Sequence, residues 1–299
     1  MSEAEIAATE ILLADAQLVI ARELGFSSWP KLKSHIQSLS SLTYVAQAAM
    51  ISNEVEAKAA AEIERLGGWR KIDSGGRLQT VCLKGQKFND SVMEHLRGLT
   101  SLKELYLVKT QVGDNVLVHL KGMTTLERFS ISGKQVTDAG LEHLRGLINL
   151  ERLYLGKTHV SDDGLAHLKG LTNIERLYLS RTQVNDAGLV HLQGLTNLKE
   201  LALNQTQVGD AGLEHLKEVT SLESLYLFKT QVSDDGLEHL KDLINLERLY
   251  IGGTQVTDGG LGHLKELISL RRLNLRFTQV TDDGENELSK ALPKCRIYH

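Results

Sequence analysis

Apolar and polar positions follow a pattern that repeats every 24 residues from Leu78 onward. Each repeat opens with an alternation, as in "LERLYL" (150–155), where leucines take one side of an extended segment and Arg152 and Tyr154 the other. A second stretch, such as "DDGLAHLKGL" (162–171), spaces its leucines three residues apart, which is a helical interval. The pattern therefore predicts a short strand followed by a short helix in every repeat.

Eight complete units cover 78–269, and a ninth begins at Leu270. Aligned, they read L-x-x-L-x-L-x-x-T-x-V-x-D-x-G-L-x-H-L-x-x-L-x-x. One unit is too small to bury its own leucines, whereas stacked units bury them against each other. The repeats therefore predict a solenoid.

The segment L-x-x-L-x-L-x-x-T-x-V resembles the leucine-rich repeat, with Thr where many members have Asn or Cys. The resemblance covers roughly residues 68–299. It implies an α/β fold: a right-handed solenoid, or horseshoe, with a parallel sheet on the concave face and short helices on the convex face. "AEIERLGGWRKIDSGGRLQTVCLKG" and "LSKALPKCRIYH" resemble the segments that cap such solenoids at their two ends.

The residues before the repeats predict an all-helical segment. Residues 1–40 resemble a helical hairpin found at the N-termini of some bacterial ankyrin-repeat proteins, with Trp29 as an anchor for packing or for a partner. Residues 41–77 are expected to form the helical cap of the solenoid, and 78–299 the repeats with their C-terminal cap.

Composition narrows the class of protein. The 299 residues are 41% hydrophobic but 5% aromatic, so the core is expected to be aliphatic. Cys82 and Cys295 lie at opposite ends of the repeats, a cysteine usage typical of a reducing compartment. The first residues lack the pattern of a secretory signal, and no run approaches 18 apolar residues. These features predict a soluble, cytoplasmic protein that does not contact a membrane.

Three columns are nearly invariant from unit to unit. The aspartate before each helix, such as Asp138, is expected to cap that helix, and a calcium ladder is the alternative. The glycine two residues later is replaced by Val92 and Val116 in two units, so the position needs a small residue rather than a left-handed backbone. The threonine column is expected to bond buried backbone groups between units.

A histidine recurs at the same place in all eight units. On a helical wheel of about 100° per residue, His143 lies about 130° from the buried direction set by Leu141 and Leu144. The column is therefore expected on the flank of the helices, in contact with adjacent turns or partly exposed. Neither metal binding nor catalysis is favoured, because no second ligand or activating group accompanies each imidazole.

The strand positions that face outward vary, and they are basic and aromatic. Their three columns contain seven Lys or Arg and two Glu, and five of the seven tyrosines, whereas the whole chain has a net charge of -4. Tyr and Arg are enriched at the energetic centres of protein interfaces. The candidate partner-binding residues are Arg128, Arg152, Tyr154, Lys157, Arg176, Tyr178, Arg181, Tyr226, Phe228, Lys229, Arg248 and Tyr250.

These observations predict a non-enzymatic scaffold without cofactor or metal that binds an acidic or phosphorylated protein segment on the concave face. The alternative is an anionic ligand such as single-stranded nucleic acid, with bases stacked on the tyrosines. A third interpretation is a solvated ladder in which Glu127, Glu151, Glu175 and Glu247 neutralise the arginines of adjacent strands. No phosphate loop, nucleophile elbow or metal triad favours an enzyme.

Overall fold

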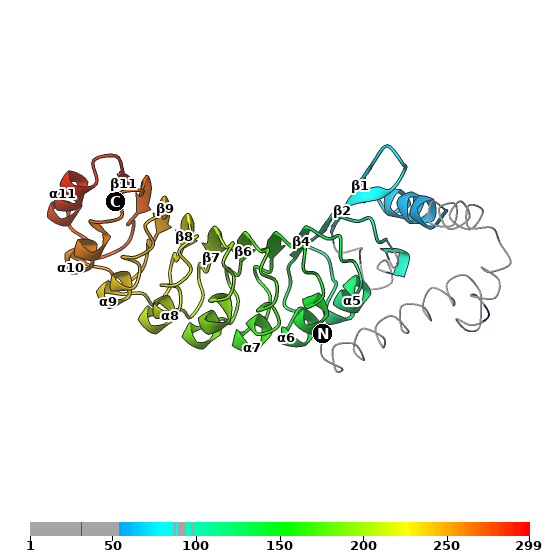
Figure 1. Ribbon diagram of the computed structural model, residues 1–299, viewed down its shortest axis with the longest axis horizontal. Helices are drawn as coiled ribbons and strands as arrows, with labels where there is room; N and C mark the ends of the chain where they lie inside the picture. The colour runs from blue at the N-terminus through cyan, green and yellow to red at the C-terminus, as the bar shows by residue number, and fades with distance from the viewer. Residues whose placement is uncertain (1–30, 32–53, 86–87, 89–93, 97–98) are drawn as a thin grey trace, which may run out of the picture. The chain divides into compact units, whose positions relative to one another are not determined.

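A computed structural model describes residues 31, 54–85, 88, 94–96 and 99–299. The chain divides into two compact units, Met1–Val55 and Glu56–His299, and the repeats belong to the second (Figure 1). The hairpin expected over 1–40, including Trp29, lies outside the described residues apart from Lys31. Within the described part of the chain, no helix has both the length and the apolar character needed to cross a membrane.

One sheet runs through the second unit, with its strands in chain order. β1 is antiparallel to β2, and every later pair is parallel, shifted by one repeat. The strands are β1 (Trp69–Ile72), β2 (Leu78–Lys84), β3 (Glu104–Val108), β4 (Arg128–Ile131), β5 (Arg152–Tyr154), β6 (Arg176–Tyr178), β7 (Glu200–Ala202), β8 (Ser224–Tyr226), β9 (Arg248–Tyr250), β10 (Arg272–Asn274) and β11 (Arg296–Tyr298).

Short helices form the opposite layer, one turn or two in each unit. They are the 3₁₀ helices η1 (Glu94–Leu96), η2 (Val118–Leu120), η3 (Glu142–Leu144), η4 (Asp186–Leu192) and η5 (Gly262–Leu264), and the α-helices α5 (Asp114–Leu117), α6 (Asp138–Leu141), α7 (Asp162–Leu165), α8 (Asp210–Glu214), α9 (Asp234–Glu238), α10 (Asp258–Leu261) and α11 (Asp282–Ala291). Within this unit the strands line the inner side of a gentle curve and the helices the outer side (Figure 1). The strand-and-helix repeat predicted from the sequence, and the solenoid, are confirmed.

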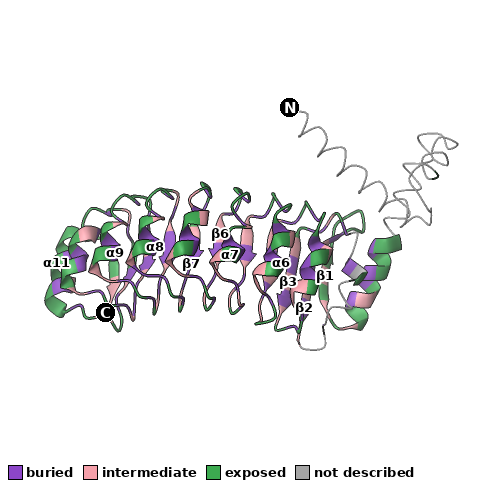
Figure 2. Ribbon diagram, turned by 90° about the horizontal axis from the view of Figure 1, so that it is seen from below, coloured by how far each residue is buried: buried purple, intermediate pink, exposed green. Residues whose placement is uncertain are grey.

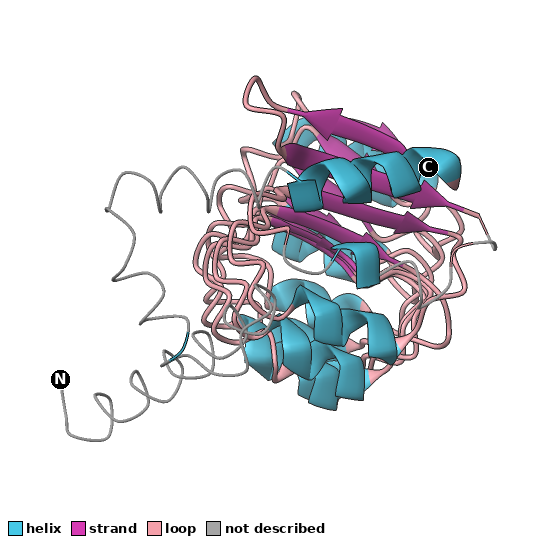
Figure 3. Ribbon diagram, turned by 90° about the vertical axis from the view of Figure 1, so that its right-hand side faces the viewer, coloured by secondary structure: helices cyan, strands magenta, loops and turns pink. Residues whose placement is uncertain are grey.

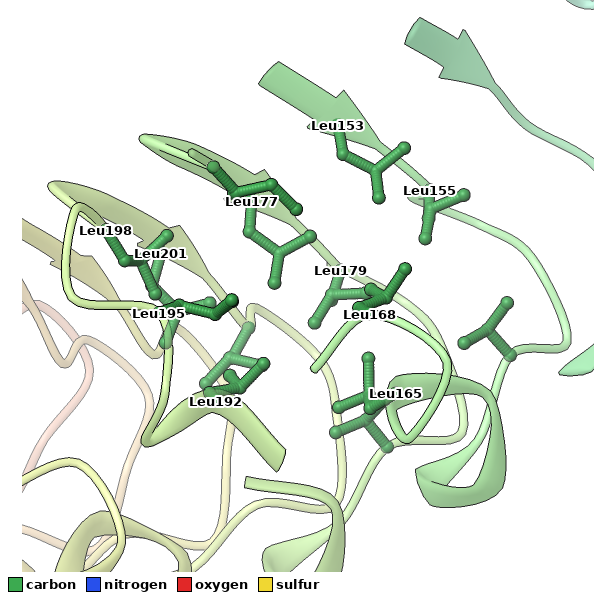
Figure 4. Packing of buried hydrophobic residues seen from close by; sticks show 14 of the residues in the cluster. Leu153, Leu155, Leu165, Leu168, Leu177, Leu179, Leu192, Leu195, Leu198 and Leu201 are labelled. Carbon is green, nitrogen blue, oxygen red and sulfur yellow. The ribbon is translucent and has the colours of Figure 1, made fainter. Parts of the chain in front are cut away.

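The core is a continuous stack of leucines between the two layers. Leu153, Leu177 and Leu201 point inward from successive strands, and Leu165 and Leu168 meet them from the helix side (Figure 4). All five are fully buried. Viewed end-on, the strands and helices form two separate layers joined by loops (Figure 3). Burying each leucine contributes about 1.5–3 kcal/mol, so the repeat itself supplies the stability of the unit.

At the N-terminal end of the sheet, a helix spans 54–65 and is followed by β1. Ala59, Ala60 and Ile63 on one face of this helix join the leucine core. Glu56 is also buried there, and its carboxylate accepts a hydrogen bond of 2.5 Å from the Leu78 amide. Burial raises the pKa of Glu56, against the lowering effect of that hydrogen bond. At the other end, α11 and β11 close the core.

The aspartate column does not cap its own helices, which corrects the sequence-based prediction. Each aspartate of the column from Asp114 to Asp258 is the first residue of its helix, and its carboxylate bonds the residue before the next helix, 23 positions later. Asp138 Oδ1 accepts from the Ser161 amide at 2.7 Å, and Oδ2 accepts from the Ser161 hydroxyl at 2.6 Å. Asp234 binds Thr257 in the same way. The acidic column, called the aspartate ladder below, therefore ties successive units together.

The glycine column serves the same ladder. A Cβ atom built on Gly164 would overlap Oδ1 of Asp138 in the preceding unit, and one on Gly188 would overlap Asp162. Neither glycine has a positive φ. The prediction that this place needs a small residue rather than a left-handed backbone is confirmed, and the reason is the carboxylate of the neighbouring unit.

The threonines of the column from Thr158 onward bond the backbone within their own unit rather than between units, whereas Thr110 Oγ1 is buried without a partner. Thr158 Oγ1 donates to the Leu155 carbonyl at 2.6 Å, and Thr182, Thr206, Thr230 and Thr254 repeat this contact. Each of these hydroxyls is buried and holds the turn at the end of its strand. The structural role was predicted, but the partner was wrong.

Candidate functional site

The outward-facing residues of β4, β5 and β6 form a basic and aromatic surface. Parallel register places Arg128 beside Arg152 and Arg152 beside Arg176, and places Tyr154 beside Tyr178. All five are partly exposed. Lys157 and Arg181 follow β5 and β6 and are exposed. The arginine–tyrosine patch is defined as Arg128, Arg152, Tyr154, Lys157, Arg176, Tyr178 and Arg181.

Two of the three neighbouring arginines have a carboxylate partner on the strand beyond. Arg128 Nη1 lies 2.6 Å from Glu104 Oε1 on β3. Arg176 Nε lies 3.6 Å from Glu200 Oε2 on β7. The row across β3 to β7 therefore reads Glu, Arg, Arg, Arg, Glu, with the outer arginines neutralised.

Arg152 stands in the middle of this row without an ion-pair partner among the described residues. Its Nε is also buried and has no hydrogen-bond partner. Arg128 Nε is buried and unpaired in the same way, so what distinguishes Arg152 is its charge, which no carboxylate among the described residues pairs while Glu104 and Glu200 pair its two neighbours. Arg152 is the strongest anion-binding candidate in the patch.

The glutamates expected to neutralise the arginines mostly do something else. Glu127 Oε1 binds Lys103 at 2.7 Å, and Glu175 Oε1 binds Lys199 at 2.8 Å. Lys103 and Lys199 come directly before β3 and β7, so both ion pairs lie at the margin of the concave face. Glu247 approaches Arg248 at 3.9 Å. The hypothesis of inter-strand Glu–Arg pairs holds for Glu104 and Glu200, which the sequence had placed on the concave face itself.

The tyrosines stack on one another. The rings of Tyr154 and Tyr178 are parallel within 5°, with centroids 4.3 Å apart. Burial raises the pKa of Tyr178, and its hydrogen bond and charge interaction with Glu200 raise it further. The phenol therefore stays protonated at neutral pH, with the Glu200 carboxylate as the acceptor of its hydrogen bond. Because the two rings cover each other's inner faces, the pair presents edges and hydroxyl groups to a ligand.

The residue after each strand adopts a left-handed backbone. Lys109, Lys157, Arg181 and Lys229 have φ values between 53° and 65°. The cause is the next unit: the Lys157 amide donates to the Ser180 carbonyl at 2.9 Å, and the Arg181 amide donates to Asn204 at 2.8 Å. Gly133 and Gly253 occupy the same column in other units. Glycine or asparagine fits this conformation at the least cost, yet four units place a cation here.

A second surface lies over β8, β9 and β10. Tyr226 and Tyr250 stack with ring centroids 4.8 Å apart. Lys229 Nζ lies 5.3 Å from the centroid of the Phe228 ring. Arg248 Nη1 donates to Ser224 Oγ at 3.1 Å. The aromatic patch is defined as Tyr226, Phe228, Lys229, Arg248, Tyr250, Arg276 and Phe277.

Sequence reasoning did not select Arg276 and Phe277. They border a cleft of about 570 Å³ together with Tyr226, Phe228 and Tyr250. Phe277 is 80% exposed and has a φ of 64°. The signal was available in the alignment, because Phe277 falls in the column that otherwise holds Gly, Gln, Lys or Arg.

The histidines of the column from His119 to His263 are partly exposed, as expected for the flanks of the helices. In the layer that these helices form, buried, intermediate and exposed residues alternate (Figure 2). One of these histidines contacts an adjacent turn: Arg145 Nε lies 3.0 Å from His167 Nδ1. Within the described residues, the one trio with atoms close enough to share an ion is Asp282, Glu285 and His299. His299 Nδ1 lies 3.2 Å from Glu285 Oε2 at the C-terminal cap.

Comparisons with known proteins agree with the repeat geometry. The sequence profile described as Leucine Rich repeat matches residues 194–217 and 266–284. The chain is similar to the crystal structure of internalin C2 from Listeria monocytogenes, at 25% identity and a TM-score of 0.56, over 75% of this chain and 92% of that one. An internalin (inlF) from the same organism aligns at 16% identity and a TM-score of 0.41, over 82% of this chain and 96% of that one.

No curated protein matches the sequence. Proteins with this fold generally mediate contacts between proteins. The stacked strands, the leucine core and the match to internalin C2 together show the fold of a leucine-rich repeat solenoid.

Proposed function

We propose that the chain is a non-enzymatic scaffold that binds an acidic or phosphorylated segment of a partner protein across its concave face. The observation that carries the proposal is Arg152, a partly exposed guanidinium without an ion-pair partner among the described residues, between two arginines that are each paired with a glutamate. Carboxylates and phosphates match the planar donors of a guanidinium and form strong, charge-assisted hydrogen bonds with it.

The residues with a left-handed backbone after the strands, called the left-handed column below, support the same function. They include Lys109, Lys157, Arg181 and Lys229. Lys157 and Arg181 extend from the turns that border β5 and β6, and both are exposed. A cation at such a position costs roughly 1 kcal/mol relative to glycine or asparagine. Cations retained there at that cost, next to an unpaired arginine, support a role in meeting negative charge.

Protein is favoured over single-stranded nucleic acid as the ligand. Base stacking needs open ring faces, and the stacking of Tyr154 on Tyr178 and of Tyr226 on Tyr250 closes one face of each ring. Rigid tyrosine pairs beside arginines suit a protein interface, where both residue types are enriched. The same proposal places the protein in the cytoplasm and assigns it no cofactor.

A capture experiment tests the proposal. The full chain and its Arg152→Gln variant are immobilised, and bound proteins are identified by mass spectrometry at low and high salt. We expect partners with acidic segments to bind the parent chain, to be lost from the variant and to weaken with salt. Lys169→Gln removes one exposed positive charge from the helix side and should retain them. Equal capture by all three proteins, or enrichment of nucleic acid, would count against the proposal.

A further inference from the structure

The aromatic patch surrounds a cleft whose chemistry differs from that of the arginine–tyrosine patch. Its walls include the rings of Tyr226, Phe228, Tyr250 and Phe277. Its volume of about 570 Å³ falls in the usual range of ligand pockets. The arginine–tyrosine patch offers charge and hydroxyl groups instead. The two surfaces therefore suit different parts of a ligand.

Phe277 makes the cleft unusual. A bulky residue at a φ of 64° is strained, and a phenyl ring with 80% of its surface exposed gains little from burial. The preceding unit has Gly253 at the same place, with a φ of 69°. Neither the turn nor the core requires a phenylalanine here. An aromatic side chain held open to solvent at a cost is expected where it packs against a partner.

Positive charge surrounds the rings. Arg181 and Arg276 border the cleft, and Lys229 lies over the Phe228 ring. No acidic side chain lies among the residues described as lining it. An occupant that complements this surface has an apolar centre and acidic flanks, which is the charge that the proposed function assigns to the partner.

We propose that the aromatic patch holds a large apolar side chain, aromatic by preference, of the same extended protein segment whose carboxylate or phosphate meets Arg152. This inference rests on the proposed function and adds a second contact to it. The ligand is then bipartite, with an acidic group over β5 and an apolar anchor between β8 and β9.

The fold sets the separation of the two groups. Neighbouring strands lie about 4.8 Å apart, so the distance from β5 to the space between β8 and β9 is about 17 Å. An extended chain covers about 3.3 Å per residue. The acidic residue and the apolar anchor are therefore expected about five positions apart, on a segment that crosses the strands.

Synthetic peptides test this geometry by fluorescence anisotropy with the full chain. The probe is labelled Glu-Glu-Gly-Ser-Gly-Ser-Phe, together with the same sequence in reverse order. The comparison peptides replace Phe with Ser, replace both Glu with Gln, or shorten the spacer to a single Gly. We expect one orientation of the full probe to bind at least tenfold more tightly than each comparison peptide.

Two variants assign the contacts. Phe277→Asn removes the ring but suits the left-handed backbone, so the fold is expected to persist, which circular dichroism checks. It should abolish the advantage of Phe over Ser, whereas Arg152→Gln should abolish the advantage of Glu over Gln. Lys169→Gln should change neither.

The outcomes separate the two proposals. If the acidic peptides bind through Arg152 but Phe adds nothing, the bipartite ligand is wrong and the proposed function stands. If the spacer length makes no difference, the two contacts do not belong to one extended segment. If neither acidic peptide binds at millimolar concentration, both proposals fail.

Discussion

The aspartate ladder and the concave face are made by the same units. The residues of the ladder are the same from unit to unit, whereas the residues of the concave face change. Along the ladder, Asp138, Asp162, Asp186 and Asp210 each bond the amide 23 positions later. Along the concave face, neighbouring positions change from Glu104 through arginines to Glu200 and Ser224. Contacts with the next unit account for a uniform column. The stacking of the units does not require the particular residues of an irregular column.

The two kinds of column also differ in the conformational cost of the residues that occupy them. Each ladder glycine lets the neighbouring carboxylate approach, so its sequence and its packing agree. The left-handed column does the reverse, because Lys157, Arg181 and Phe277 occupy a conformation that favours glycine or asparagine. Positions that depart from the residue favoured by the fold are the ones to test for function.

The largest effect is expected from breaking the ladder. Asp234→Ala removes two hydrogen bonds to Thr257, of 2.7 and 2.5 Å, and leaves the Thr257 amide without its acceptor. Hydrogen bonds to a charged group contribute about 1.5–3 kcal/mol, so the free energy of unfolding should fall by about 3 kcal/mol in urea titrations.

Asp235 provides the matched control for this change. It is the next residue and carries the same charge, but it is exposed. Asp235→Ala should change the free energy of unfolding by less than about 0.5 kcal/mol. Similar losses in both variants would show that helix capping, rather than the bond to the next unit, explains the column.

A somewhat smaller loss is expected from filling the space beside a ladder carboxylate. In Gly212→Ala the new Cβ would lie 2.5 Å from Asp186 Oδ1 and 3.1 Å from Asp186 Cα. Overpacking of this kind costs about 1–3 kcal/mol. Gly146→Ala has no atom within 4 Å of the new Cβ and should leave the unfolding midpoint unchanged or slightly raised. Equal changes in the unfolding midpoint of both variants would show that the glycine column does not serve to make room for the ladder carboxylates.

The sequence predicted the solenoid because periodicity reports burial directly, and the strand-and-helix interval recurs in the repeats that the structure describes from Leu102 onward. It could not identify the partner of Asp138, since the bond to Ser161 depends on how two units stack. The same limit applies to the site. Register could be inferred, but the neutralisation of Arg128 by Glu104, the mutual stacking of Tyr154 and Tyr178 and the backbone of Phe277 all depend on tertiary geometry.

A stabilising change is expected in the left-handed column. Lys157→Asn keeps the amide that donates to Ser180 and replaces lysine with a residue that accepts a φ of 65° more readily. The free energy of unfolding should rise by about 0.5–1 kcal/mol, while binding of the acidic probe weakens. Lys169→Asn, outside this column, should produce no gain in stability. A gain without any loss of binding would mean that the cation at this place serves no ligand.

The smallest effects distinguish the arginines themselves. Arg128→Gln breaks the 2.6 Å pair with Glu104, in which the side chains are 31% and 23% exposed, and such a pair contributes about 0.5–1 kcal/mol. Both variants remove a buried Nε that has no hydrogen-bond partner, but Arg152→Gln breaks no ion pair, so its unfolding midpoint should hold or rise slightly. Ligand binding should show the reverse order, with the greater loss in Arg152→Gln. If Arg152 proved the more important of the two for stability, its place in the row would be structural, and the concave face would have lost its leading candidate for recognition.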